Sequence, residues 1–269
     1  MAVPALLYHY CSMESFLSII NSGVIRLSDS RCTNDAYENV WIMKPVRDVL
    51  DNAKQSNEKL VLELEKYITG IGRKPVPYIA CFSEMGDLLS QWRAYGDDGK
   101  GVAIGFEVKI SEGLPVTYEG MQGVNDSLKI RNVVYDYDVQ RKLVDEIIHN
   151  ALQDVFTNVP SWVNSLKLLS YVYKHPAFRE EKEWRIIHTP LIYDNYMMDG
   201  GISALKFSTK RDTLASFFEL PVTAIGNFVA IKEIVLGPKN RTLPDILHDF
   251  LEMRYYPGVI IRRSEVPYR

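Results

Sequence analysis

Two kinds of spacing alternate along the first hundred residues of the chain. Short runs of apolar and aromatic residues bounded by polar turns predict strands. These runs lie at residues 6–10, 24–28, 78–84 and 102–106. Ser12 is placed to N-cap a helix that Gly23 ends, and residues 88–95 have the spacing of a second, short helix. This part of the chain is therefore expected to alternate strands with helices.

Helical spacing dominates the middle of the chain, and strand-like runs return near its end. Helices are expected at residues 35–70 with a break near Pro45, at 138–156, at 160–173, at 211–219 and at 243–254. Strands are expected at residues 204–207, 228–231, 233–237 and 258–261. The pattern predicts an α+β protein, with residues 1–269 as one elaborated domain and residues 138–175 as a helical insertion within it.

Composition narrows the class of protein. With 269 residues and 46% hydrophobic content, the chain can bury a substantial core. Its three cysteines fit neither a disulfide framework nor a zinc site, which favours a reducing cytoplasm. We expect no signal peptide, no membrane span and no bound metal, because none of the corresponding patterns occurs. A net charge of −3 argues against a general nucleic-acid coat.

The candidate chemistry centres on residues 181–187, Glu-Lys-Glu-Trp-Arg-Ile-Ile, which predict a strand. Glu181, Glu183 and Arg185 would share one face of it, because side chains alternate along a strand. The two carboxylates would then lie roughly 6.5 to 7 Å apart and repel each other unless a cation or hydroxyl lies between them. A ribose or an arginine would serve. The alternative is a surface ladder of these glutamates with Arg185 and neighbouring basic residues.

Four segments of the chain occur together in a known family. They are residues 7–23 (LYHYCSMESFLSIINSG), 27–38 (LSDSRCTNDAYE), 81–106 (CFSE followed by DLLSQWRAYGDDGKGVAIGF) and 174–187 (KHPAFREEKEWRII). In these segments the chain resembles a bacterial and phage-associated family catalogued as a domain of unknown function, which is similar in strand order to the ADP-ribosyltransferase-like fold. The resemblance implies a split β-sheet core with helical insertions.

The resemblance also implies roles for individual residues, with NAD as substrate. His9 would hold a ribose of NAD, Ser83 would shape the nicotinamide pocket, and Glu183 would be the catalytic glutamate. Glu181 would orient Glu183 or activate the acceptor. The remaining candidates for contacts to NAD are the aromatic residues Tyr10, Trp92 and Tyr95, which could stack on its bases, and Arg93, which could meet the pyrophosphate.

Simpler interpretations exist for three of these residues. His9 lies among apolar residues and could be a core histidine bonded to a backbone carbonyl. Trp92 and Tyr95 lie three residues apart, which is ordinary spacing for a helix that packs on a core.

The leading hypothesis is an NAD-dependent ADP-ribosyltransferase, a defence or toxin-type effector in the cytoplasm. It would transfer ADP-ribose to an unknown protein or nucleic acid. One alternative is an NAD glycohydrolase, in which water is the acceptor. A third hypothesis is a non-catalytic module on the same fold that binds a nucleotide or a protein partner.

Overall fold

The computed structural model describes residues 4–32, 40–68, 77–108, 128–153, 159–192, 198–199, 201–210, 213–222 and 229–268. Along the chain its elements are β1 (Leu7–Cys11), α1 (Met13–Ser22), β2 (Val24–Asp29), η1 (Ser30–Cys32), α2 (Met43–Ile68), β3 (Tyr78–Ser83), α3 (Leu89–Ala94), β4 (Val102–Val108), β5 (Leu128–Asn132), α4 (Tyr137–Gln153), α5 (Val159–Ser170), η3 (Pro176–Glu181), β6 (Glu183–His188), β7 (Leu191–Ile192), β8 (Met198–Asp199), β9 (Lys206–Lys210), β10 (Thr213–Pro221), β11 (Val229–Leu236), α6 (Pro244–Met253) and β12 (Ile260–Arg263). This confirms the predicted α+β class.

Within the described residues, ten strands form one sheet that forks at β3. One path through the sheet runs β12-β11-β4-β1-β3-β2-β10-β9, and β6 joins the other edge of β3 with β5 outside it. β1 meets β3 near one end, where Tyr8 pairs with Ser83, and β2 meets it near the other end, where Ser28 pairs with Ile79. Cys81 lies between these two contact points. β1 and β2 therefore diverge from the same edge of β3.

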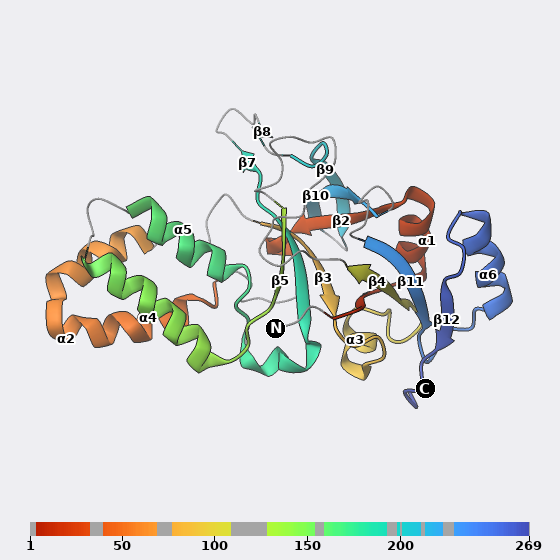
Figure 1. The fold of residues 1–269 in the computed structure, drawn as a ribbon, viewed down its shortest axis with the longest axis horizontal. Helices are drawn as coiled ribbons and strands as arrows, with labels where there is room; N and C mark the ends of the chain where they lie inside the picture. Colours follow the sequence, from red (N-terminus) through yellow and green to blue (C-terminus); the bar gives the residue numbers. More distant parts are fainter. Residues whose placement is uncertain are drawn as a thin grey trace.

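The main hydrophobic core lies on one face of this sheet. It brings together Phe16 of α1, Ile104 of β4, Phe218 of β10 and Leu247 of α6, all at most 2% exposed. Figure 1 shows α1 and α6 together at one end of the molecule, beside β11 and β12.

A second core lies at the other end of the molecule, where α2, α4 and α5 pack together (Figure 1). It includes Val46 of α2, Val144 of α4 and Leu166 of α5, each with no exposed surface. We call these three helices the helical lobe. The predicted insertion at residues 138–175 supplies α4 and α5, but the contribution of α2 was not predicted. The division of the chain into domains stays a prediction.

Local sequence patterns predicted the first elements correctly. Ser12 Oγ accepts a hydrogen bond from the Ser15 amide (3.2 Å), and Gly23 ends α1 with a φ of 64°, a conformation that glycine adopts without strain. The strands predicted near residues 6–10, 24–28, 78–84 and 102–106 are all present as β1, β2, β3 and β4.

Several predicted features are wrong. The separate strands expected at residues 228–231 and 233–237 form one strand, β11, with an irregularity between Ile231 and Glu233. The helix expected at residues 211–219 is strand β10, at least from Thr213 onward, because residues 211 and 212 lie outside the described part. Its pairing with both β2 and β9 outweighs any helical preference. Pro45 does not break a helix either: it lies in the first turn of α2, where a missing N–H removes no intrahelical bond.

Two other expectations concern residues that the structure describes only in part. Residues 33–38 of the segment 27–38 lie outside the described residues. In the part of the chain that is described, no helix combines the length and apolar character needed to cross a membrane.

Candidate functional site

Glu181 and Glu183 lie on two different elements. The strand was predicted to begin at Glu181, and this start is wrong. Glu181 is the last residue of η3, and β6 begins only at Glu183. Lys182 between them has a φ of 44°, in the left-handed region, so the alternation of a strand does not extend back to Glu181. His175 stabilises the start of η3 by accepting a hydrogen bond from the Ala177 amide (3.0 Å).

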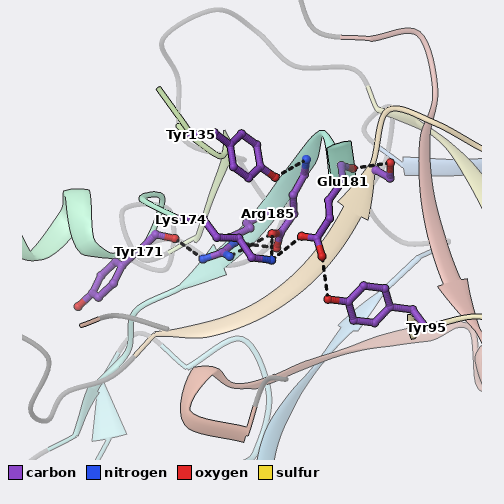
Figure 2. Close-up of polar contacts among 8 residues, drawn as sticks. Tyr95, Tyr135, Tyr171, Lys174, Glu181 and Arg185 are labelled. Carbon is purple, nitrogen blue, oxygen red and sulfur yellow. Dashed lines mark hydrogen bonds and ion pairs between the residues drawn. The ribbon is translucent and has the colours of Figure 1, made fainter. Parts of the chain in front are cut away.

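A lysine fills the space between the two carboxylates. Lys174 Nζ lies 2.5 Å from Glu181 Oε2 and 2.9 Å from Glu183 Oε2, as Figure 2 shows for Lys174 and Glu181. The side chains of these three residues are between 4% and 10% exposed. The expectation that a cation separates the glutamates is therefore met by a residue that the sequence analysis did not single out.

Arg185 holds Glu183 from the other side. Its Nε donates to Glu183 Oε1 (2.8 Å) and its Nη2 to Glu183 Oε2 (3.1 Å), while its Nη1 donates to the Tyr171 carbonyl (2.8 Å). The Arg185 side chain is 1% exposed. The pairing of Arg185 with a glutamate was foreseen, but the surface ladder is wrong in its location, because this ion pair is buried.

Three hydroxyl groups complete the surroundings of the glutamates. The Tyr95 hydroxyl donates to Glu181 Oε1 (3.1 Å), and the Tyr135 hydroxyl accepts from the Glu183 amide (3.0 Å), as Figure 2 shows. Ser83 Oγ donates to the Glu181 carbonyl (2.7 Å). We define the carboxylate cluster as Lys174, Glu181, Glu183, Arg185 and Tyr95. Its two cations and two anions balance.

The two glutamates differ in their proton affinity. Burial would raise the pKa of Glu183, but the charges of Arg185 and Lys174 outweigh it and hold that pKa at about 2. Burial raises the pKa of Glu181 above its usual value, because there Lys174 offsets only part of the effect. The pKa of Lys174 is raised: burial lowers it, but the two carboxylates more than compensate. One carboxylate is thus held ionised while its neighbour is closer to taking a proton.

Ser83 and Tyr95 are the predicted NAD-contacting residues that the structure brings to the cluster. Ser83 also accepts from the Met85 amide (3.1 Å), so it fixes the turn after β3. Burial raises the pKa of the Tyr95 hydroxyl, which therefore stays protonated and can donate to Glu181.

His9 lies at the fork of the sheet. Its Nδ1–H donates to the Cys81 carbonyl (2.9 Å), and its ring lies 5.7 Å from that of Phe82. Burial lowers the pKa of His9, although the bond to Cys81 acts in the opposite direction, so the ring is neutral. The bond to a carbonyl is the one expected of a core histidine.

Tyr10, Trp92 and Arg93 make contacts outside the carboxylate cluster. The Tyr10 hydroxyl donates to the Met85 carbonyl (2.6 Å), and its ring meets that of Trp92 edge-on at 4.7 Å. Trp92 is fully buried and donates from Nε1 to Asp87 Oδ1 (2.7 Å). The Arg93 guanidinium lies 4.9 Å from the centre of the Tyr268 ring. Packing thus accounts for Trp92, as its helical spacing suggested.

The described residues contain no group of three or more His, Cys, Asp or Glu side chains that could hold a metal ion.

Comparisons with known proteins add one finding. Residues 91–186 match the model of a family described as a protein of unknown function (DUF2971). This segment, about a third of the chain, contains the entire carboxylate cluster. The match supports a family of unknown function, as the motifs suggested. Searches with the whole chain found no match among curated proteins and none among solved structures.

Proposed function

We propose that the chain transfers ADP-ribose from NAD to a macromolecule, and that the reaction takes place at the carboxylate cluster. The observation that carries the proposal is the pair Glu181 and Glu183, which share one lysine but have pKa values shifted in opposite directions. Two carboxyl groups whose environments separate their pKa values suit the two roles that glycosyl transfer requires.

Glu183 is suited to stabilise the positive charge that develops on the ribose. Loss of nicotinamide passes through an oxocarbenium-like transition state, and a carboxylate that binds the 2′-hydroxyl stabilises that state more than the ground state. With a pKa of about 2, Glu183 is ionised at neutral pH. It would therefore be the catalytic residue, as the resemblance implied.

Glu183 has one position at which a ribose hydroxyl could bind. A carboxylate has about four acceptor positions, and three are taken by Arg185 Nε, Arg185 Nη2 and Lys174 Nζ. The Cys81 thiol also hydrogen-bonds to Glu183 and lowers its pKa. A thiol is a weak donor, so a ribose hydroxyl could replace it at this position.

Glu181 is suited to move a proton. Its raised pKa brings it closer to neutral pH, which makes it a better base than Glu183 for an acceptor nucleophile. Lys174 and Tyr95 hold its two oxygens in place.

The arrangement of strands also supports the proposal. Tyr8 on β1, Ser83 on β3 and Glu183 on β6 are consecutive partners across three adjacent strands. Ser83 and Glu183 thus share one face of neighbouring strands with Tyr8, whereas His9 lies on the opposite face with Ile104 and Phe82, so the strand arrangement supports Ser83 and Glu183 but not His9.

Two other functions remain as alternatives. An NAD glycohydrolase would use the same residues with water as acceptor. A non-catalytic module that binds a nucleotide or a protein is favoured by a different observation: the four charged residues of the cluster neutralise one another and are at most 10% exposed. Such a balanced, buried set can be purely structural.

The test compares nicotinamide release from NAD by the wild type and by Glu183→Gln. A matched control is Asp29→Asn, because Asp29 is also a buried carboxylate paired with an arginine, Arg31, at 2.5 Å. Asp29 pairs with Tyr78 at the opposite end of β3 from Ser83, roughly 17 Å away at ~3.3 Å per residue. We expect Glu183→Gln to lower the rate about 100-fold or more and Asp29→Asn to retain it.

The products separate the three functions. Label from NAD on a macromolecule supports transfer, whereas free ADP-ribose without such label indicates the glycohydrolase. Stabilisation by NAD or another nucleotide without nicotinamide release indicates the binding module. Release that Glu183→Gln leaves unchanged would remove the catalytic assignment.

A further inference from the structure

The backbone of Lys174 follows α5 and is hydrogen-bonded to Gln140 of α4 in the helical lobe, although its side chain reaches into the carboxylate cluster. Tyr173, just before it, forms a parallel bridge with Val134, and the Lys174 amide donates to the Val134 carbonyl (3.3 Å). The Lys174 carbonyl accepts from Gln140 Nε2 (3.0 Å). Gln140 lies in the first turn of α4. The position of the shared cation is therefore set from the lobe.

The side-chain amide of Gln140 joins three segments that are distant in the sequence, through bonds to Trp41, Val134 and Lys174. Gln140 has no exposed surface, yet it carries a polar amide. That amide accepts from Trp41 Nε1 (2.9 Å) and donates from Nε2 to the Val134 carbonyl (2.6 Å) as well as to that of Lys174. An apolar residue of the same size would fill the site without these bonds. These bonds tie the carbonyls of Val134 and Lys174 to α4.

Both neighbours of Lys174 are held by the same group of residues. The Tyr173 hydroxyl donates to the Gln140 carbonyl (3.2 Å), and its ring is buried in the core of the lobe. The ring of His175 meets that of Trp41 edge-on at 4.5 Å. Lys174 is therefore fixed on both sides, and its long side chain spans from the lobe to the glutamates.

We propose that Gln140 is a positioning residue, through which the helical lobe keeps Lys174 between Glu181 and Glu183. A small displacement of the lobe would withdraw the ammonium group from both carboxylates. A role of this positioning in ADP-ribose transfer rests on the proposed function. The effect of Lys174 on the ionisation of the two glutamates does not.

The effect can be measured on Glu181. The groups that face it are Lys174 from the lobe side, Tyr95 from the end of α3, and Glu183 and Arg185 from β6, with Tyr135 and Cys81 beside Glu183. Among these described groups, Lys174 is the one whose backbone bonds to Gln140. Because the charge of Lys174 lowers the pKa of Glu181, withdrawal of Lys174 raises it.

The experiment follows the titration of glutamate carboxyl carbons by ¹³C NMR in the full chain, with Glu181→Gln to assign the resonance. Gln140→Met keeps the shape of the side chain and removes its bonds. We expect it to move the midpoint of Glu181 upward by about one pH unit. The control is Leu166→Ala, which opens a cavity in the lobe core without touching Gln140 and should lower Tm but leave the midpoint in place.

Two results would overturn the proposal: a Glu181 midpoint that Gln140→Met leaves unchanged, or an equal shift in Leu166→Ala. If Gln140→Met does not fold, Trp41→Phe removes the indole N–H that bonds to Gln140 together with part of the ring, and it should give a smaller shift in the same direction; no shift there would also refute the proposal. Nicotinamide release is assayed separately. A shifted midpoint in a protein that never releases nicotinamide would reject the proposed function and keep the positioning role.

Discussion

Replacement of Lys174 by methionine tests whether the cation is required between the two glutamates. Methionine retains most of the apolar stem but removes the charge that lies 2.5 Å from Glu181 and 2.9 Å from Glu183. Arg185 still compensates Glu183 through two hydrogen bonds. The carboxylate left without a cationic partner in the cluster is therefore Glu181.

The expected cost follows from the burial of the pair. At these distances each attraction is worth roughly 6 kcal/mol at an effective dielectric constant of ~20, and desolvation of the ammonium offsets part of the sum. Loss of one partner from a buried ion pair costs about 3 to 5 kcal/mol. We expect a loss of that size for Lys174→Met at pH 8, where Glu181 is ionised in the unfolded chain.

The loss should shrink at lower pH. Burial already raises the pKa of Glu181 in the folded protein, and removal of Lys174 raises it further. A carboxyl group whose folded pKa lies above its unfolded value of 4.5 destabilises the fold increasingly as pH rises above 4.5. At pH 5 the folded variant can protonate Glu181 at little cost, so the difference from the wild type is smaller there than at pH 8.

Urea unfolding at pH 5 and pH 8 measures both quantities. The control is Lys44→Met, which removes a lysine from an exposed i,i+4 pair with Asp48 and should cost no more than about 0.5 kcal/mol. A loss below about 1 kcal/mol for Lys174→Met at pH 8, or an equal loss at both pH values, would refute the reasoning.

Three further predictions concern the same structure. The Glu183 pKa of about 2, against 4.5 in the unfolded chain, implies about 3 kcal/mol of stability that is present above pH 4.5 and is lost as pH falls towards 2. Urea unfolding of Glu183→Gln should lack this acid-dependent part of the free energy of unfolding. The Asp87 carboxylate accepts hydrogen bonds from Trp92 and from the segment 264–268, and Asp87→Asn weakens them. Amide hydrogen exchange in that segment should therefore speed up, and unchanged exchange would contradict the prediction. His9→Ala removes the hydrogen bond to the partly buried Cys81 carbonyl at the fork and should cost about 1 to 3 kcal/mol, whereas an exposed His9 would cost far less.

Local patterns were sufficient for the elements that begin and end with clear capping residues. Ser12 and Gly23 bound α1 as predicted, because each acts through bonds within a few residues. The segment 213–221 has no such bounds, and its strand conformation depends on partners that lie far away in the sequence, such as Arg26 opposite Glu219. Strand β5 (Leu128–Asn132) was not predicted at all, because it is defined by its pairing with β6.

The site was predicted in part for a physical reason. Two glutamates near each other repel unless a cation or a hydroxyl lies between them, and that argument holds whichever group supplies it. Lys174 was missed because it lies seven residues before Glu181 and no periodic pattern connects the two. Charge balance alone could not single it out, since segment 174–187 also contains Arg179 and Lys182, which lie closer to the glutamates in the sequence. The turn at Lys182 was not predictable, because lysine rarely has a positive φ.

Nicotinamide release from NAD, measured side by side for the wild type and Glu183→Gln at equal folded concentration, tests the central claim most directly. The account predicts release by the wild type and a rate at least about 100-fold lower in the variant. Equal release by both proteins, or no release by the wild type with NAD in excess, would contradict it.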